Sequence, residues 1–263
     1  MTTPISYEIC YMLDFRSLRE VPANCQRIYF GHETCEKLLP TFDEIGGLLE
    51  ISEKRGLGLT FVTPFLTEQG MEKVLLFLEK LQSAMPRSGE IVTSDWGLIH
   101  QISKNNIWTP VVSRLIAGQQ VDFRLVNTTE RSSPAMLHHL SSCTLMKNRT
   151  AELFRQLGVH RFELSNVFQP MTLAGDQPFR CSLHVPFVPL TIFRTCPEGL
   201  DFNRIKKPCH MNHCSQNRQR WQYRYSKHAI YCLHNALYYS NPDQETQLKR
   251  NASIDRIVCH DEM

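Results

Sequence analysis

Short apolar segments alternate with longer segments of helical periodicity along most of the chain. The alternation predicts a parallel sheet whose strands are joined by helices, because such connections are typical of βαβ units. Apolar residues also recur at helical spacing between many of the predicted strands, at residues 42–54, 67–85, 95–104 and 134–157. The segments with the length and residue types of buried strands are residues 7–13, 26–30, 58–62, 90–93, 110–116, 161–164, 183–193, 229–233 and 254–258.

The helical pattern is clearest at residues 67–85. Charged residues there fall mostly outside a single apolar stripe, which predicts that one face of the helix packs on the sheet. That stripe comprises Val74, Leu75, Phe77, Leu78 and Leu81.

The number of strand candidates favours a single β/α barrel over an open sheet, with residues 1–263 forming one domain. A doubly wound fold is the alternative, but the turn at Gly56 and Gly58 lacks the third glycine of a phosphate-binding loop. The alternation of strand and helix patterns stops at residues 197–228, which are polar. We therefore expect an α/β fold, a TIM-like barrel whose completeness the sequence leaves open, with a cysteine-bearing loop over its C-terminal face.

Composition narrows the class of protein. Hydrophobic residues make up 42% of the chain and charged residues 21%, as in ordinary globular domains. The net charge of +3 comes without a long basic run, so no nucleic-acid partner is indicated. We find neither a signal peptide nor an apolar run of membrane-spanning length, and so expect a cytoplasmic protein with no membrane partner. Thiols stay reduced there, so the ten cysteines need an explanation other than disulfides.

Four of the cysteines suggest a metal site. Cys196, Cys209 and Cys214 are spaced C-x12-C-x4-C, and Cys35 stands far upstream. Clustered thiolates with one remote partner are typical of metal and iron–sulfur sites. Cys35 and Cys196 each follow a predicted strand, and in a barrel the C-terminal ends of the strands share the face that carries the active site. We expect the four sulfurs to converge there.

Other interpretations of these cysteines stay open. Zinc is one, because His210 and His213 lie beside Cys209 and Cys214, and zinc takes both sulfur and nitrogen ligands. A second alternative is that the four cysteines are unrelated thiols that bind no common metal. Cys232, within a predicted strand, competes with Cys35 as the fourth ligand.

Three charged residues are candidates for catalysis because each ends a predicted strand on the same face: Asp95, Arg114 and Glu163. A guanidinium such as that of Arg114 suits a small anionic substrate. Each residue also has a plain structural role, Asp95 as a helix cap and the other two as an ion pair.

Five blocks of the sequence resemble the collagenase-like peptidase family U32, especially its small UbiU/UbiV-like branch of oxygen-independent ubiquinone hydroxylation proteins. They are residues 28–35, 92–97, 159–164, 193–196 with Cys209 and Cys214, and 254–258. The resemblance implies a β/α barrel and a 4Fe–4S cluster on Cys35, Cys196, Cys209 and Cys214. It also implies oxygen-independent hydroxylation in some relatives and a peptidase label in others. Because UbiU and UbiV act as a pair, it implies a second family member as a heterodimer partner.

The chain departs from the family pattern at two points. The C-x4-C spacing is one residue longer than in the UbiV type, and Asp122-Phe123-Arg124 stands where many relatives have Asp-Pro-Arg.

We therefore expect an enzyme, or an enzyme subunit, whose cluster supports redox chemistry on a small molecule. A non-catalytic partner with a structural cluster or zinc is the first alternative. A peptidase or other hydrolase is the second, although the chain has neither a Gly-x-Ser-x-Gly nor a His-Glu-x-x-His motif.

Overall fold

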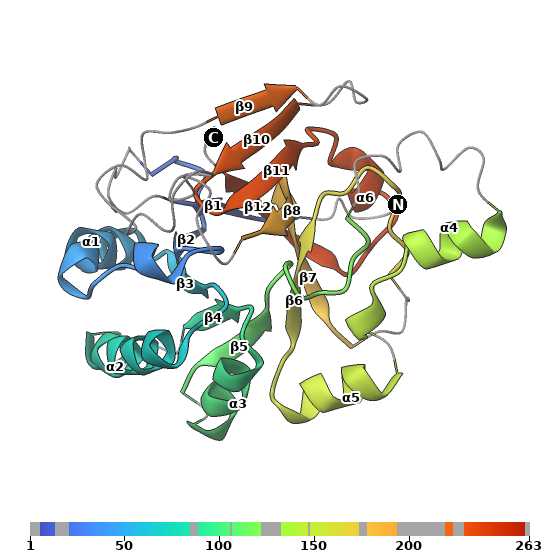
Figure 1. Cartoon of the computed structure of the whole chain (residues 1–263). Coiled ribbons are helices and arrows are strands. Elements are labelled where there is room, and N and C mark those ends of the chain that lie inside the picture. Colours follow the sequence, from blue (N-terminus) through green and yellow to red (C-terminus); the bar gives the residue numbers. More distant parts are fainter. Residues whose placement is uncertain are drawn as a thin grey trace, which may run out of the picture.

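Eight parallel strands close into a barrel (Figure 1). The computed structural model describes residues 6–13, 21–84, 89–105, 107–121, 133–146, 148–173, 178–193, 219–222 and 229–260. Around the barrel the strands follow the order β1-β12-β7-β6-β5-β4-β3-β2. The predicted TIM-like α/β barrel is therefore confirmed. Its strands are β1 (Glu8–Met12), β2 (Arg27–Gly31), β3 (Gly58–Thr63), β4 (Glu90–Thr93), β5 (Thr109–Val112), β6 (Arg161–Ser165), β7 (Arg180–Val185) and β12 (Ile254–His260).

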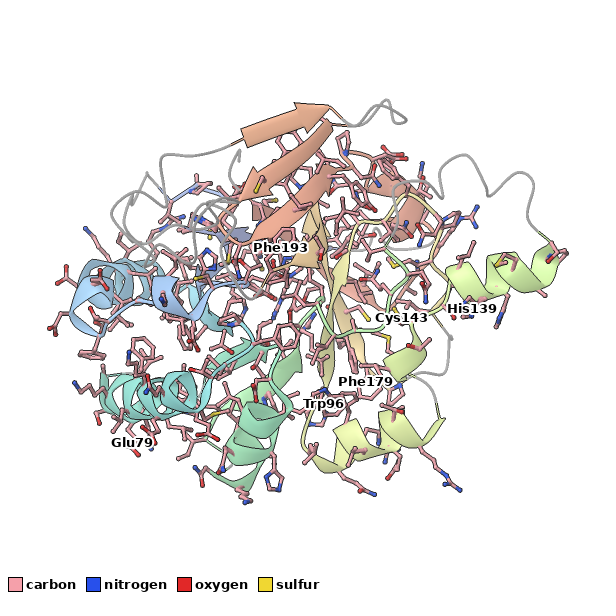
Figure 2. The ribbon with its side chains drawn as sticks, viewed as in Figure 1. Glu79, Trp96, His139, Cys143, Phe179 and Phe193 are labelled. Atoms are coloured by element: carbon pink, nitrogen blue, oxygen red, sulfur yellow. The ribbon has the colours of Figure 1, made fainter. Side chains whose placement is uncertain are left out.

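Helices α1, α2, α3 and α5 lie outside the barrel wall (Figure 1). The apolar stripe predicted for residues 67–85 is the buried side of α2, where Val74, Phe77, Leu78 and Leu81 are all buried. Between α3 and α5, Trp96 stacks on Phe154 with ring centroids 4.8 Å apart (Figure 2). The helices are α1 (Gly46–Arg55), α2 (Glu68–Ala84), α3 (Trp96–Asn105), α4 (Pro134–Leu140), α5 (Asn148–Gln156) and α6 (Glu245–Leu248), with 3-10 turns η1 (Glu36–Leu38), η2 (Asp43–Ile45) and η5 (Thr144–Met146).

A second, antiparallel sheet has the order β8-β11-β10-β9. It consists of β8 (Phe187–Ile192), β9 (Gln219–Gln222), β10 (Ala229–Leu233) and β11 (Ala236–Ser240). In Figure 1 it covers one end of the barrel. Three expectations change as a result. The run 183–193 is two strands, β7 in the barrel and β8 in this sheet. The predicted strand 229–233 is β10, outside the barrel. Part of the expected loop 197–228 is β9.

The interior of the barrel carries layers of contrasting chemistry. Contacts between strands on opposite sides of a closed barrel must cross its interior. One such contact joins Arg256 of β12 to Glu90 of β4 near the N-terminal ends of the strands, and another joins Tyr29 of β2 to Glu163 of β6 further up. Beside them lies an apolar cluster formed by Cys10, Tyr29, Val62, Val92, Val111 and Val258. The barrel is thus a filled core, and small molecules can approach only at its ends.

Candidate functional site at the barrel mouth

The loop after β2 places Cys35 just beyond the C-terminal end of that strand. Gly31, which ends the strand, has φ +112° and lies so close to Val62 that a Cβ would collide with the Val62 carbonyl oxygen. Only glycine fits this position. In the following turn, Nδ1 of His32 accepts hydrogen bonds from the backbone N–H groups of Thr34 (3.2 Å) and Cys35 (3.0 Å). The turn thereby fixes Cys35, which is partly buried.

One amide side chain joins this loop to the second sheet. Asn235, in the turn between β10 and β11, donates through Nδ2 to the carbonyl oxygens of Thr34 (2.7 Å) and Phe193 (2.9 Å). The backbone N–H of Phe193 donates in turn to the carbonyl of Asn235 (2.7 Å). Phe193 lies between the second sheet and the barrel (Figure 2). The end of β8 is therefore held beside Cys35.

The other three predicted ligands, Cys196, Cys209 and Cys214, lie outside the described residues. The premise that Cys196 follows a barrel strand is wrong, because β8 belongs to the second sheet, but the amide of Asn235 still brings the end of β8 to the Cys35 loop. Within the described part of the chain, no three His, Cys, Asp or Glu side chains are grouped as metal ligands. Cys232 is buried within β10, as its apolar pattern predicted.

Arg114 and Glu33 form a buried ion pair at the mouth. Nε and Nη2 of Arg114 donate to the two carboxylate oxygens of Glu33, at 2.6 and 2.7 Å, and Nη1 donates to the Phe187 carbonyl at 2.6 Å. Burial opposes ionisation of Glu33, but the Arg114 charge outweighs it and lowers the pKa of this carboxyl. The expected structural partner of Arg114, Glu163, was the wrong one. Because the guanidinium fork already holds Glu33, a substrate carboxylate would have to displace that side chain.

Glu163 instead begins a chain of side chains that crosses three neighbouring strands. Its Oε2 lies 2.6 Å from Nε2 of His184, and Nδ1 of His184 lies 2.8 Å from Nε2 of His260. The hydroxyl of Tyr29 donates to Oε1 of Glu163 at 3.1 Å. Burial raises the carboxyl's affinity for a proton, yet the hydrogen bond from His184 and the charge of Arg256 leave the pKa of Glu163 below its usual range. Burial lowers the pKa of His184 and takes that of His260 well below its usual value.

Asp95 has the structural role that its position after β4 suggested. Its Oδ1 accepts from the backbone N–H of Leu98 (3.1 Å) in the first turn of α3, and its Oδ2 from that of Leu66 (3.4 Å). The side chain thus caps α3 and ties it to the loop after β3. Of the three predicted catalytic residues, the structure brings Arg114 and Glu163 into buried networks at the mouth and places Asp95 at a helix end.

A cavity of about 760 Å³ opens beside the Arg114 pair. Its walls come from the loop after β3, the start of α3, the loop after β5, η5 and β8, and they combine polar and apolar groups in similar proportion. The lining side chains include Phe65, Trp96, Arg114, Gln119, Leu190 and Thr191. The volume lies in the range of small-molecule sites.

Sequence reasoning missed Tyr29, His184 and His260. A local signal existed for two of them: in β7, Ser182 and His184 alternate with apolar residues, which is typical of a strand with an inward polar side, and His260 ends the last strand. Nothing in the sequence indicated that these residues contact one another, because they lie on three strands that are far apart in the chain.

Among the helices described, none has the length and apolarity that crossing a membrane requires.

Comparison with known proteins supports the fold. No protein-family model matches this sequence, and no curated protein does. The solved structure of the U32 peptidase Mk0906 is similar, with a TM-score of 0.50 and 13% sequence identity over 100% of this chain and 96% of that chain. At this identity the likeness concerns the fold alone. The chain therefore has a fold like that of a U32 peptidase along its whole length.

Proposed function

We propose that this protein binds a 4Fe–4S cluster at the barrel mouth through Cys35, Cys196, Cys209 and Cys214 and takes part in redox chemistry on a small molecule, of the oxygen-independent hydroxylation type. The observation that carries the proposal is the pair of hydrogen bonds from Asn235 to Thr34 and Phe193. They place the residue before Cys35 and the residue three positions before Cys196 on either side of one amide group.

Chain geometry makes a shared site feasible. Three residues span at most about 11 Å, so Cys196 can reach Cys35 when the backbone after Phe193 turns towards the Cys35 loop. Soft thiolate ligands suit iron–sulfur clusters and also zinc. The residues therefore fit such a group, with His32 holding the Cys35 turn and Asn235 holding the two segments together. A cluster bound here would supply electron transfer, which no side chain provides.

The cavity favours a reactive site over a purely structural one. A structural metal needs no neighbouring space, whereas chemistry on a small molecule does. The cavity beside Arg114 opens on the barrel face on which Cys35 lies. This supports an enzyme or enzyme subunit over a non-catalytic partner, and a heterodimer with a second barrel of this kind is compatible with both.

The test is metal and acid-labile sulfide content after anaerobic purification. Wild type is expected to hold about four irons and four sulfides per chain. Cys35→Ser is expected to lose most of both, while Cys259→Ser, a partly buried thiol at the end of β12, serves as the matched control and keeps them.

Two outcomes would contradict the proposal. Zinc without sulfide in wild type would replace the cluster with a zinc site. Loss of iron in Cys232→Ser, with Cys35→Ser unaffected, would make Cys232 the fourth ligand.

A further inference from the structure

The three side chains Glu163, His184 and His260 form a directional chain from the barrel interior to its mouth. They come from β6, β7 and β12, which are neighbours in the barrel. Glu163 and His184 are buried, whereas His260, the last residue of β12, is partly exposed. The chain thus begins in the core and ends at the C-terminal end of β12, on the face where barrels carry their active sites.

The hydrogen-bond partners assign the protons along this chain. Arg256 donates to the Tyr29 oxygen at 2.9 Å, so the Tyr29 hydrogen points to Glu163. An ionised carboxylate only accepts, so Nε2 of His184 carries hydrogen and its Nδ1 must accept from Nε2 of His260. The remaining ring nitrogen, Nδ1 of His260, is therefore left without a hydrogen and carries a lone pair.

Burial and the Arg114 charge keep both imidazoles neutral, although the Glu163 and Glu33 carboxylates act in the opposite direction at His184. His184 is faced by Glu163 from β6, His260 from β12, Tyr29 from β2, and the Glu33–Arg114 pair from the loops after β2 and β5. For His260 the surrounding charge is that of Arg114, while His184 faces it as a neutral ring and its neighbour on β1 is the uncharged Met12. Burial and the Arg114 charge both favour the neutral ring.

Holding Glu163 does not require the third member, whose structural contribution is to satisfy the buried Nδ1 of His184. Glu163 already accepts hydrogen bonds from Tyr29 and His184, and these two suffice for a buried carboxylate. His260 adds no bond to Glu163. It extends the chain by one imidazole towards the mouth.

We propose that His260 is a catalytic general base whose Nδ1 takes a proton from a weakly acidic O–H or N–H group of a small neutral molecule bound at the barrel mouth. The O–H or N–H bond of the ligand breaks, its electron pair stays on the ligand atom, and an N–H bond forms on the ring. His184 and Glu163 are positioning residues. They hold the tautomer and place a negative charge behind the imidazolium that forms. No electron is transferred, and the site does not depend on the four cysteines.

Nitrogen NMR of the full chain labelled with ¹⁵N-histidine tests the tautomers directly in wild type. Signals assigned with His184→Gln and His260→Gln are expected to show both rings neutral at pH 7, with hydrogen on Nε2. Hydrogen on Nδ1 of His260 would overturn the proposal. His100, on the exposed side of α3, provides the control signal.

Diethyl pyrocarbonate, which acylates the neutral imidazole nitrogen, tests whether the lone pair is reachable and supported. His260 is expected to react, and Glu163→Gln is expected to slow its reaction several-fold, since loss of the carboxylate behind His184 lowers the basicity of the imidazole that His184 supports. The rate at His100 is expected to stay unchanged. An unreactive His260, or equal rates at His260 in wild type and Glu163→Gln, would leave the chain structural. Cys35→Ser is expected to react as wild type does, so failure of the cluster proposal and failure of this one are distinguishable.

Discussion

Both ends of the barrel interior carry charged side chains, but the groups differ in kind. At the N-terminal end, Arg256 contacts Glu8 (2.6 Å) and Glu90 (2.6 Å), Arg27 contacts Glu8 (2.8 Å), and Arg161 contacts Asp255 (2.6 Å). Among the described residues at the mouth, the Glu33–Arg114 pair is of this type, and the chain of Glu163, His184 and His260 lies next to it.

The difference separates stability from chemistry. The pKa of Glu90 is lowered and the pKa values of Arg161 and Arg256 are raised, so these three groups of the N-terminal network, which we call the plug, keep their charges throughout the neutral range. Histidine exchanges protons near neutrality and can do so during a reaction. The barrel therefore closes one end with fixed charges and presents exchangeable protons at the other, which agrees with the general placement of barrel active sites at the C-terminal ends of the strands.

The largest expected effect comes from breaking the plug. Arg256→Met leaves Glu8 and Glu90 without their shared buried partner, and we expect the free energy of unfolding to fall by about 3–5 kcal/mol. Denaturant unfolding measures it. Arg180→Met is the matched control, because Arg180 is largely exposed and its contact with Asp255 is long, at 3.8 Å. The expected loss in the free energy of unfolding is below about 1 kcal/mol. Equal losses in the two variants would remove the plug as a source of stability.

The free energy of unfolding at acidic pH gives a second test of the N-terminal network. Burial opposes ionisation of Glu90, yet its hydrogen bond to Arg256 and the surrounding arginine charges lower its pKa from 4.5 to about 2. A carboxyl group whose pKa is lowered in the folded state stabilises the fold at pH values above its pKa in the unfolded chain. That contribution, about 3 kcal/mol, is lost as the pH falls from 4.5 towards 2. Unfolding free energies measured across this window should fall less steeply for Glu90→Gln than for wild type. The exposed Glu79→Gln control should retain the wild-type slope.

A smaller effect is expected at the mouth, in a different pH window. The pKa values of His184 and His260 are lowered from 6.5 by burial, so the folded protein keeps both rings neutral where the unfolded chain takes up protons. The free energy of unfolding therefore keeps its full histidine contribution above pH 6.5. Below pH 6.5 it falls by at most about 1.4 kcal/mol per pH unit for each histidine.

Unfolding free energies at pH 7.5, 6.5 and 5.5 measure that loss. The double variant His184→Gln with His260→Gln should lose this dependence, and the exposed His100→Gln should keep it. Stability that rises on acidification in wild type would mean that the mouth histidines are charged in the folded state.

The smallest effect is expected for an ion pair on the surface. Arg155 and Glu152 lie 2.9 Å apart on α5, and each side chain is about half exposed. Arg155→Ala should change the free energy of unfolding by less than about 0.5 kcal/mol, because water and salt screen exposed pairs. A loss as large as that of Arg256→Met would show that burial is not what distinguishes the plug.

Local patterns carried much of the fold. The stripe on α2 and the spacing of the strands follow from which side chains one element buries, and that information is contiguous in the sequence. The glycine of the Cys35 loop and the cap formed by Asp95 are local for the same reason. One local signal was overlooked in the sequence: Pro186 lies within the apolar run 183–193, which divides there into β7 and β8. Proline alone does not decide such a break, because Pro110 and Pro189 are accommodated inside β5 and β8.

By itself, the sequence determined the barrel class, the main helices and the position of Cys35 after a strand. Only the tertiary structure decided that β8 leaves the barrel, that Arg114 pairs with Glu33, and that Glu163 leads through His184 to His260. The physical reason is that hydrophobic periodicity reports which side of an element is buried, whereas the partner of a buried charge depends on strand order and register. Closing the barrel sets both, and it brings together residues that lie far apart in the chain.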